Sequence, residues 1–326
     1  MDTTIFVDGF AAGKRVDDGP HRGTVTDGRP PHLRSTVAVF VSPLSVVSLA
    51  IVALTLGTAR ESASADANVE EWPLPDLPEP SGIAYHPLRK SLFVVGDEGD
   101  IAEVSTEGKL LRVRHIGGDL EGVTSNPADG KVYVVREGVD VILEIDVDDL
   151  KIAREIPVSR TYDGDTNYIH AGGDGIEGIT FRPTPSPGSA PDVFAVNQYD
   201  PPVLLELALP AAGAAPGTAA TIRNAWPLKS PPISDVSWDA TVDGFVVVSA
   251  LWRNASVVSP AGAELRSIRI PGIMQEGIAR LPDGTFVIVQ DTGGLLKWKP
   301  PSDPFVAQDQ AGVDASRGNP VKSSDP

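Results

Sequence analysis

Cysteine is absent from the 326 residues, and aromatic residues make up only 6% of them. Without thiols the chain can form neither a disulfide scaffold nor a thiolate zinc site, and a cysteine nucleophile is excluded. The 32 glycines and 30 prolines give many turns per unit length. Frequent turns suit short strands better than long helices, so we expect an all-β protein.

Basic side chains are also in short supply, and the formal net charge is -17. Residues 1–65 carry as many basic as acidic side chains, so the excess negative charge falls entirely on the rest of the chain. A body of this charge repels phosphate backbones and anionic lipid. Nucleic acid is therefore disfavoured as a partner and cations are favoured, although the charge can also serve solubility alone.

The N-terminal region divides into three segments. Residues 1–35 are polar, lack apolar periodicity and are expected to be disordered. Residues 36–57 are uncharged and match the roughly 20 residues that a membrane helix needs. Basic residues precede this stretch, and the linker 58–67 contains the small-residue run SASADA, as in a signal peptide. The alternatives are cleavage near Ala65 or Ala67 and an uncleaved plasma-membrane anchor; either places the body in the cell envelope or outside the cell.

A short phrase recurs through residues 68–300. Its five copies read PSGIAY, LEGVTS, IEGITF, ISDVSW and QEGIAR. Each copy is followed by a turn, an apolar β-branched run and an alternating strand, which predicts an antiparallel meander of four strands. Units of about 40 residues are typical of propeller blades. The repeat therefore predicts a five-bladed β-propeller of four-stranded antiparallel blades.

The ends of this repeat suggest how the ring closes. The fifth unit has only three strands before the chain turns polar, and a lone strand-like segment at 69–75 precedes the first unit. Pairing the two would complete the last blade with an N-terminal strand and remove the free sheet edges of an open array. Residues 301–326 lack a strand pattern and are expected to form a disordered tail.

The residues of the repeat resemble those of a known protein family. The phrase S/E-G-I, the pattern D-G-x-x-x-V-V-x-[DE] and above all QEGIARLPDGTFVIVQDTG at 275–293 resemble the SdiA-regulated (YjiK-like) β-propeller proteins of bacterial envelopes. The resemblance covers residues 68–300 and implies an envelope propeller. The chain departs from the pattern at the Pro-rich inserts of the third unit and at Asp235, where the other units have Gly.

Oxygen-bearing side chains are expected to gather at one mouth of the channel, where the first strand of each blade starts and the second ends. Converging carboxylates raise one another's pKa and favour a hard cation, for which calcium is the natural candidate. The candidate metal ligands are Glu121, Glu177, Glu276, Asp97, Glu137 and Asp291. The candidate ligand-binding residues are Ser81, Asn197, Gln198, Ser234 and Arg136. Alternatively, the acids cap strands, or Arg136 neutralises part of their charge.

A second group of acidic residues lies in the sequence DGDTNYIHAGGD. Asp163, Asp165, Asn167 and Asp174 fall at ligand positions of a calcium-binding loop, but Tyr168 stands where such a loop requires Gly. The sequence therefore does not encode an EF-hand. A solvated polar connector is the favoured interpretation of this segment.

Catalytic machinery is not apparent from the residues. The sequence shows no Ser-His-Asp set, phosphate-binding glycine loop or nicotinamide fingerprint. His86, His115 and His170 occupy unrelated repeat positions and are expected at the surface, with only His170 near the mouth. We predict a module that binds a small molecule or an envelope protein. The alternative is a metal-dependent hydrolase of the lactonase, esterase or phosphoesterase type.

Overall fold

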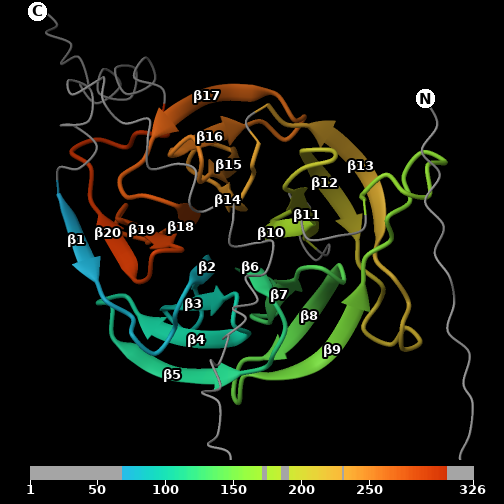
Figure 1. The fold of residues 1–326 in the computed structure, drawn as a ribbon, viewed down its shortest axis with the longest axis horizontal. Helices are drawn as coiled ribbons and strands as arrows, with labels where there is room; N and C mark the ends of the chain where they lie inside the picture. Colours follow the sequence, from blue (N-terminus) through green and yellow to red (C-terminus); the bar gives the residue numbers. More distant parts are fainter. Residues whose placement is uncertain (1–67, 171–174, 185–190, 230, 307–326) are drawn as a thin grey trace, which may run out of the picture. The chain divides into compact units, whose positions relative to one another are not determined.

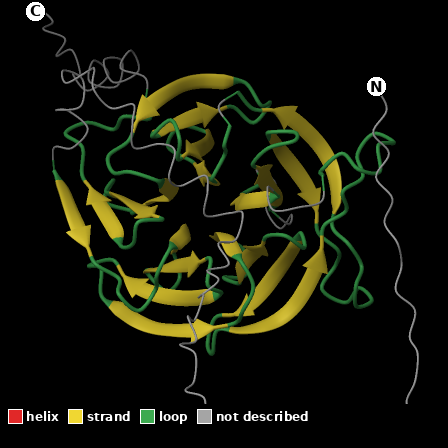
Figure 2. Ribbon diagram, viewed as in Figure 1, coloured by secondary structure: helices red, strands yellow, loops and turns green. Residues whose placement is uncertain are grey.

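Twenty short strands build the protein body, arranged as five four-stranded sheets in a ring (Figure 1). The computed structural model describes residues 68–306 except 171–174, 185–190 and 230, and within these ranges it contains strands and turns but no α-helix (Figure 2). All neighbouring strands within the sheets run antiparallel. The prediction of an all-β, five-bladed propeller is confirmed.

The first two blades each contain four consecutive strands. Blade 1 has β2 (Pro80–His86), β3 (Ser91–Gly96), β4 (Asp100–Ser105) and β5 (Leu110–His115). Blade 2 has β6 (Leu120–Ser125), β7 (Val132–Arg136), β8 (Val141–Asp146) and β9 (Lys151–Pro157). In both, the first strand is innermost and the fourth is outermost (Figure 1).

Blades 3 and 4 repeat this pattern. Blade 3 has β10 (Ile176–Arg182), β11 (Asp192–Asn197), β12 (Val203–Ala208) and β13 (Thr221–Pro227). Blade 4 has β14 (Asp235–Asp239), β15 (Gly244–Ser249), β16 (Asn254–Val258) and β17 (Glu264–Arg269). The fifth sheet has β18 (Gln275–Arg280), β19 (Phe286–Gln290), β20 (Leu295–Trp298) and β1 (Val69–Trp72). In that sheet β1 lies antiparallel beside β20, with Val69 opposite Trp298.

The chain after β20 also packs on the body. Phe305 is buried, and Asp303 forms an ion pair with Arg280 of β18 at 2.5 Å. The body therefore extends past residue 300, the boundary that the sequence suggested. The segments 1–35, 36–57 and 58–67 and the rest of the tail from 307 lie outside the described residues. In the described part of the chain, no helix has the length and apolar character to span a membrane.

Burial explains the sequence pattern of each blade. The middle strands lie between neighbouring blades, and all six residues of β3 and of β15 are buried. Their sequences are accordingly almost continuous runs of Val, Leu and Phe. The outer strands β5 and β17 instead alternate between half-buried and exposed positions over most of their length. Each fully buried large apolar side chain contributes about 1.5–3 kcal/mol, so the core is spread between the blades.

Glycine allows the inner strands to approach one another at the axis. A Cβ atom on Gly82 would lie 2.2 Å from the backbone oxygen of Glu121, and one on Gly122 would lie 2.5 Å from that of Glu177. These distances are too short for any side chain, so backbone packs directly on backbone here. We call this ring of close contacts the neck. The G-I/V phrase of the repeat is thus a packing requirement.

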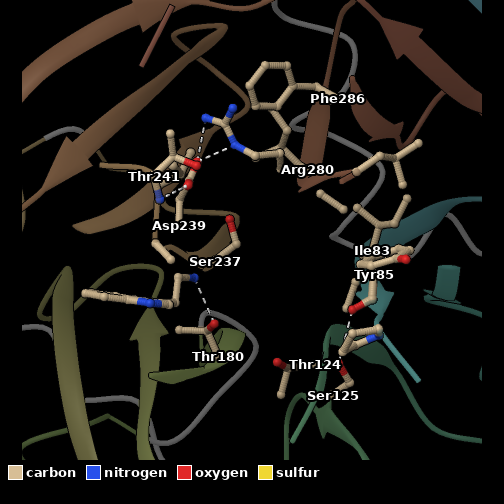
Figure 3. A pocket seen from close by; sticks show the side chains of 18 of the residues that line it. Ile83, Tyr85, Thr124, Ser125, Thr180, Ser237, Asp239, Thr241, Arg280 and Phe286 are labelled. Carbon is tan, nitrogen blue, oxygen red and sulfur yellow. Dashed lines mark hydrogen bonds and ion pairs between the residues drawn. The ribbon is translucent and has the colours of Figure 1, made fainter. Parts of the chain in front are cut away.

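The neck separates the two ends of the inner strands. Their first residues, with the ends of the second strands, form the end that we call the mouth. Their later residues line a cavity of about 710 Å³ at the opposite end (Figure 3), which we call the distal cavity. Ile83, Thr124, Thr180 and Ser237 belong to its lining.

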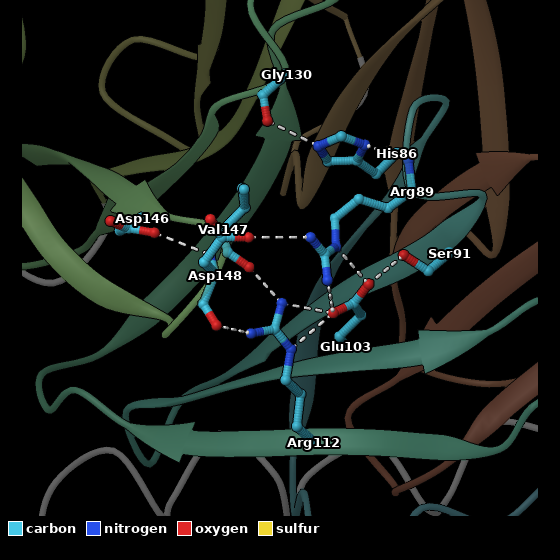
Figure 4. Close-up of polar contacts among 9 residues, drawn as sticks. All are labelled: His86, Arg89, Ser91, Glu103, Arg112, Gly130, Asp146, Val147 and Asp148. Atoms are coloured by element: carbon cyan, nitrogen blue, oxygen red, sulfur yellow. Dashed lines mark hydrogen bonds and ion pairs between the residues drawn. The ribbon is translucent and has the colours of Figure 1, made fainter.

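A buried glutamate and two arginines of blade 1 connect that blade to blade 2 away from the axis (Figure 4). Glu103 accepts hydrogen bonds from Arg89 at 2.8 Å and Arg112 at 2.7 Å. Burial raises the pKa of Glu103, but the bonds from these arginines outweigh it and hold the pKa below its usual range. Arg112 also donates to the backbone oxygens of Val147 and Asp148 in blade 2. A similar arrangement in blade 2 places Arg154 between Glu144 and the loop after β12.

Candidate metal centre at the channel mouth

Irregular register at the start of the inner strands frees residues from regular pairing. Register shifts occur there in blades 1, 2, 3 and 5. Such bulges leave an extra residue outside the ladder and commonly lie beside functional sites. The skipped positions include Ser81, Glu121, Glu177 and Glu276, all of which the sequence placed at the mouth.

Three carboxylates converge at the mouth between blades 1 and 2. Asp97, Asp119 and Glu121 each offer an oxygen atom, and these atoms all lie within 4.8 Å of one another. Asp97 follows β3, Asp119 precedes β6, and Glu121 is the second residue of β6. Ser81 donates a hydrogen bond to Asp97. The carboxylate type and spacing suit a hard cation that prefers oxygen ligands.

The other predicted carboxylates interact with these three. Burial raises the pKa of Glu121 well above its usual range, and the charges of Asp97 and Glu137 add to this effect. Burial likewise raises the pKa of Glu177, with the charge of Glu121 as the next cause. For Glu276, burial raises the pKa to about 8 and the nearby Asp291 contributes. The structure therefore brings the predicted acids into one electrostatically linked group.

Arg136, which the sequence offered as a counter-charge for this group, has an ion-pair partner outside it. Arg136 forms its ion pair with Glu155 of β9 at 3.5 Å, and its Nε is buried without a hydrogen-bond partner among the described residues. The ion pair directs one end of the Arg136 guanidinium toward β9, and the alternative in which Arg136 neutralises part of the mouth charge stays a prediction. The acids at the mouth retain repulsion that a bound cation would relieve.

The predicted ligand-binding residues differ in burial and in hydrogen-bond partners. Asn197 is completely buried, and its amide donates to the backbone oxygens of Tyr199 and Pro201. These two bonds hold the loop after β11, at the mouth end of blade 3. Gln198 is half-buried, and its backbone N–H donates to the oxygen of Gly175 at 3.0 Å.

Ser234 is the predicted ligand-binding residue with the most direct link to the acids. Its hydroxyl accepts a hydrogen bond from the backbone N–H of Ala250 at 3.3 Å and bonds to Glu276. The bond to Ser234 lowers the pKa of Glu276 but does not offset the effect of burial. Ser234 therefore holds a mouth carboxylate in place.

Asp235 occupies the repeat position at which the other blades have Gly. Its carboxylate oxygens lie beside the α-carbons of Gly178 and Gly277, whose missing side chains make room for it. Burial raises the pKa of Asp235 to about 8, although the backbone N–H groups of Val236 and Ile278 donate to it and lower the pKa. One carboxyl group thus fills the neck next to the mouth.

The histidines differ from expectation in one case. His86 is buried and not at the surface: its Nε2 bonds to the backbone oxygen of Gly130 at 2.7 Å, which joins blade 1 to a turn of blade 2 (Figure 4). His115 is exposed and pairs with Asp100 at 3.2 Å, and His170 is exposed in its loop. None of the three belongs to the carboxylate cluster found in the described residues.

The loop acids stay apart from this cluster. Asp163 and Asp165 are exposed, and the carboxylate of Asp165 accepts the backbone N–H of Asn167 at 2.8 Å. Asp174 lies outside the described residues. The carboxylate cluster found in the described chain is the one at the mouth.

Sequence reasoning missed Asp119 and the role of Asp235. Asp119 lies just before β6, outside the repeated phrase, so its place in the repeat gave no signal. Asp235 stood out as a departure from the repeat, and that departure was the available signal. In the other four blades this repeat position is too close to its neighbours for a Cβ atom. An aspartate at the same position in blade 4 therefore places its carboxylate at the axis.

Comparison with known proteins supports the family and the fold. The model of the SdiA-regulated family matches residues 61–209. No curated protein matches the chain. Glutaminyl cyclase from Myxococcus xanthus is similar in structure, with 14% identity, a TM-score of 0.50 and coverage of 71% of this chain and 93% of that one. A protein of unknown function from Bacteroides caccae has 10% identity and a TM-score of 0.42, covering 64% and 69% of the two chains. The first of these likenesses supports the propeller fold alone.

Proposed function

We propose that the protein is an exported binding module that holds a calcium ion at its mouth, and the match of residues 61–209 to the model of the SdiA-regulated family supports a role of this kind. The convergence of Asp97, Asp119 and Glu121 within 4.8 Å carries the proposal. A divalent cation there would favour the ionised form of all three acids and relieve their mutual repulsion.

The burial of the neighbouring acids favours a cation over water. Glu177 is 3% exposed, and its pKa is raised well above its usual range by burial and by the charge of Glu121. A group of buried carboxylates must either bind protons or meet positive charge at neutral pH. Calcium takes six to eight oxygen ligands in flexible geometry, which suits acids that come from separate blades.

The ion would also provide a place for a ligand. Asp119 is exposed and Asp97 is half-buried, so the site opens toward solvent. Three carboxylates leave coordination positions that water or a ligand oxygen can fill. We propose that an oxygen-bearing small molecule or an envelope protein binds at these positions. Binding is favoured over hydrolysis because the carboxylate cluster of the described residues contains no histidine, so a general base would have to come from the acids that hold the ion.

Export forms a separate part of the proposal. The uncharged stretch 36–57 behind a basic leader supports a signal peptide or a membrane anchor. Cell fractionation should place the propeller outside the cytoplasm. A cytoplasmic pool with an intact N-terminus would contradict export and leave the calcium site to be judged separately.

Thermal unfolding of the full chain tests the calcium site. Millimolar calcium should raise the melting temperature relative to chelator, because a ligand of the folded state stabilises by about 2.7 kcal/mol at one hundred times its Kd. Asp119→Asn and Glu121→Gln should each blunt this rise by removing a ligand charge. Asp163→Asn serves as the matched control and should leave the rise intact, since Asp163 is exposed and outside the cluster.

Calorimetry adds a second measurement, which shows whether protons are released or taken up when calcium binds. Because acids of raised pKa must lose protons when the ion binds, calcium binding at about pH 7 should release protons. Calcium titrations in buffers of different ionisation enthalpy give the number of protons released. Equal melting curves with calcium and chelator would refute the site, and a rise lost in Asp163→Asn but retained in Asp119→Asn would move it to the loop.

A further inference from the structure

The distal cavity is chemically unlike the mouth, and nothing in the proposed calcium site uses it. Its volume of about 710 Å³ falls within the range of small-molecule sites, roughly 300–1,000 Å³. Its wall combines residues of the five inner strands with Asp303 and Phe305 from the chain after β20. We infer that this cavity binds an uncharged carbohydrate of one or two sugar rings.

Hydroxyl groups form an arc on one side of the cavity. Thr124, Thr180 and Ser237 occupy the same repeat position, two residues after the neck residue, in the consecutive blades 2, 3 and 4. The equivalent positions of blades 1 and 5 are Ala84 and Ala279. The cavity therefore has a hydroxyl-bearing side and an apolar side.

The hydroxyls of this arc retain bonding capacity. Thr124 and Ser237 point into the cavity, and neither hydroxyl has a hydrogen-bond partner among the described residues (Figure 3). Thr124 is only 7% exposed, and its hydroxyl is not among the buried side-chain atoms without a partner, so the exposed part of this residue faces the cavity, where a ligand can bond to it. The hydroxyl of Thr180 accepts the backbone N–H of Trp238 at 2.9 Å and can still donate its proton.

The charges of the cavity are already paired, which disfavours an anionic ligand. Arg280 binds Asp239 at 2.6 Å and Asp303 at 2.5 Å, so two carboxylates face its single positive charge. Asp283 pairs with Lys299 at 3.1 Å. No cation of this lining is left to bind a phosphate or carboxylate, and the net charge of these five side chains is slightly negative.

Aromatic surface completes the fit to a sugar. Trp238 lines the cavity, is partly exposed, and is held edge-to-face against Phe245 at 5.1 Å between ring centroids. A rigid aromatic ring offers an apolar face for the C–H groups of a sugar ring. Sugar hydroxyls donate and accept, as do those of Thr124 and Ser237, so the two sets can satisfy each other. A peptide of similar size lacks such a row of groups that can do both.

Titration of the full chain with glucose, N-acetylglucosamine and maltose, followed by saturation-transfer NMR and by chemical shift, tests this site. At least one of these sugars should bind, and glucose 6-phosphate should bind at least tenfold more weakly than glucose. Ser237→Ala and Thr124→Val should each weaken sugar binding about five- to tenfold, as expected for one lost hydrogen bond.

Two control variants distinguish sugar binding in the distal cavity from effects elsewhere in the molecule. Ser256→Ala makes the same change in blade 4 at a buried serine outside the cavity lining, and it should leave the affinity unchanged. Asp119→Asn should blunt the rise in melting temperature that calcium causes and leave sugar binding unchanged, so the two proposals fail separately. The inference is overturned if none of the three sugars binds, if glucose 6-phosphate binds as well as glucose, or if affinity survives both cavity substitutions.

Discussion

The mouth and the distal cavity are built by the same five inner strands, yet they present opposite chemistry. At the mouth, carboxylates meet one another in buried surroundings, and the pKa values of Glu121 and Glu276 rise. At the distal cavity, each acidic side chain of the lining is paired with a base. A few residues along a strand therefore separate a group that favours a cation from a wall suited to uncharged ligands. The scaffold fixes the positions, and the side chains at each repeat position decide the chemistry.

The neck between the two ends should be the most sensitive part of this comparison. In Gly122→Ala, the new Cβ atom would lie 2.5 Å from the backbone oxygen of Glu177, which cannot move without disturbing blade 3. We expect a loss of more than about 3 kcal/mol in the free energy of unfolding, measured by urea denaturation. Gly213→Ala is the control, because nothing lies within 4 Å of its Cβ position. Equal stability of the two variants would show that the neck is not tightly packed.

Breaking charge pairing at the distal cavity should have the next largest effect. Arg280→Met leaves Asp239 buried without its partner, and we expect a loss of about 3 kcal/mol in the free energy of unfolding. Lys299→Met breaks the exposed pair with Asp283 and should cost less than about 1 kcal/mol. Chemical denaturation of both variants measures the difference. Similar losses would mean that pairing at this end contributes no more than a surface ion pair.

The pH dependence of the free energy of unfolding should arise from the buried acids of the mouth and the adjoining neck. Burial raises the pKa of Glu276 from 4.5 to about 8 in the folded protein, so between these values the folded state holds a proton that the unfolded chain has released. The free energy of unfolding in chelator should therefore fall as the pH rises through this range, by up to about 1.4 kcal/mol per pH unit for each such proton. Urea denaturation between about pH 5 and pH 9 measures this slope.

Substitutions show which residues cause the fall of the free energy of unfolding with pH. Glu276→Gln should flatten the fall by removing one titrating group, and saturating calcium should flatten it by favouring the ionised acids. Ser256→Ala should leave the slope as it is in the parent protein. Stability that rises with pH in chelator would contradict the pKa shifts at the mouth.

The sequence predicted more of the fold than of the two sites. Five copies of one phrase sufficed for the blades, because the neck requires glycine and the middle strands require β-branched residues. Glu121, Glu177 and Glu276 were found because they share a repeat position. Asp119 lies outside the repeat, so its approach to Asp97 depends on the path of a loop that periodicity does not encode.

The distal cavity was invisible in the sequence for a different reason. Threonine, serine and alanine are ordinary residues in strands, and only the ring brings their repeat positions together. Asp303 lay in a segment that reads as a polar tail, so its pairing with Arg280 gave no local signal. The burial of His86 escaped notice similarly, because the backbone oxygen of Gly130 that it contacts belongs to another blade.

Asp235 also bears on how such a ring can diversify by gene duplication. Its carboxylate uses the space that Gly178 and Gly277 leave open, so the axis has room for one carboxyl group and not for a second beside it. An array of identical copies of blade 4 would crowd several acids onto one axis, while copies of blade 2 alone would leave the neck without this group. The blades are consequently not interchangeable modules. The neck of this ring holds a side chain from blade 4 and only glycine backbone from the other four blades.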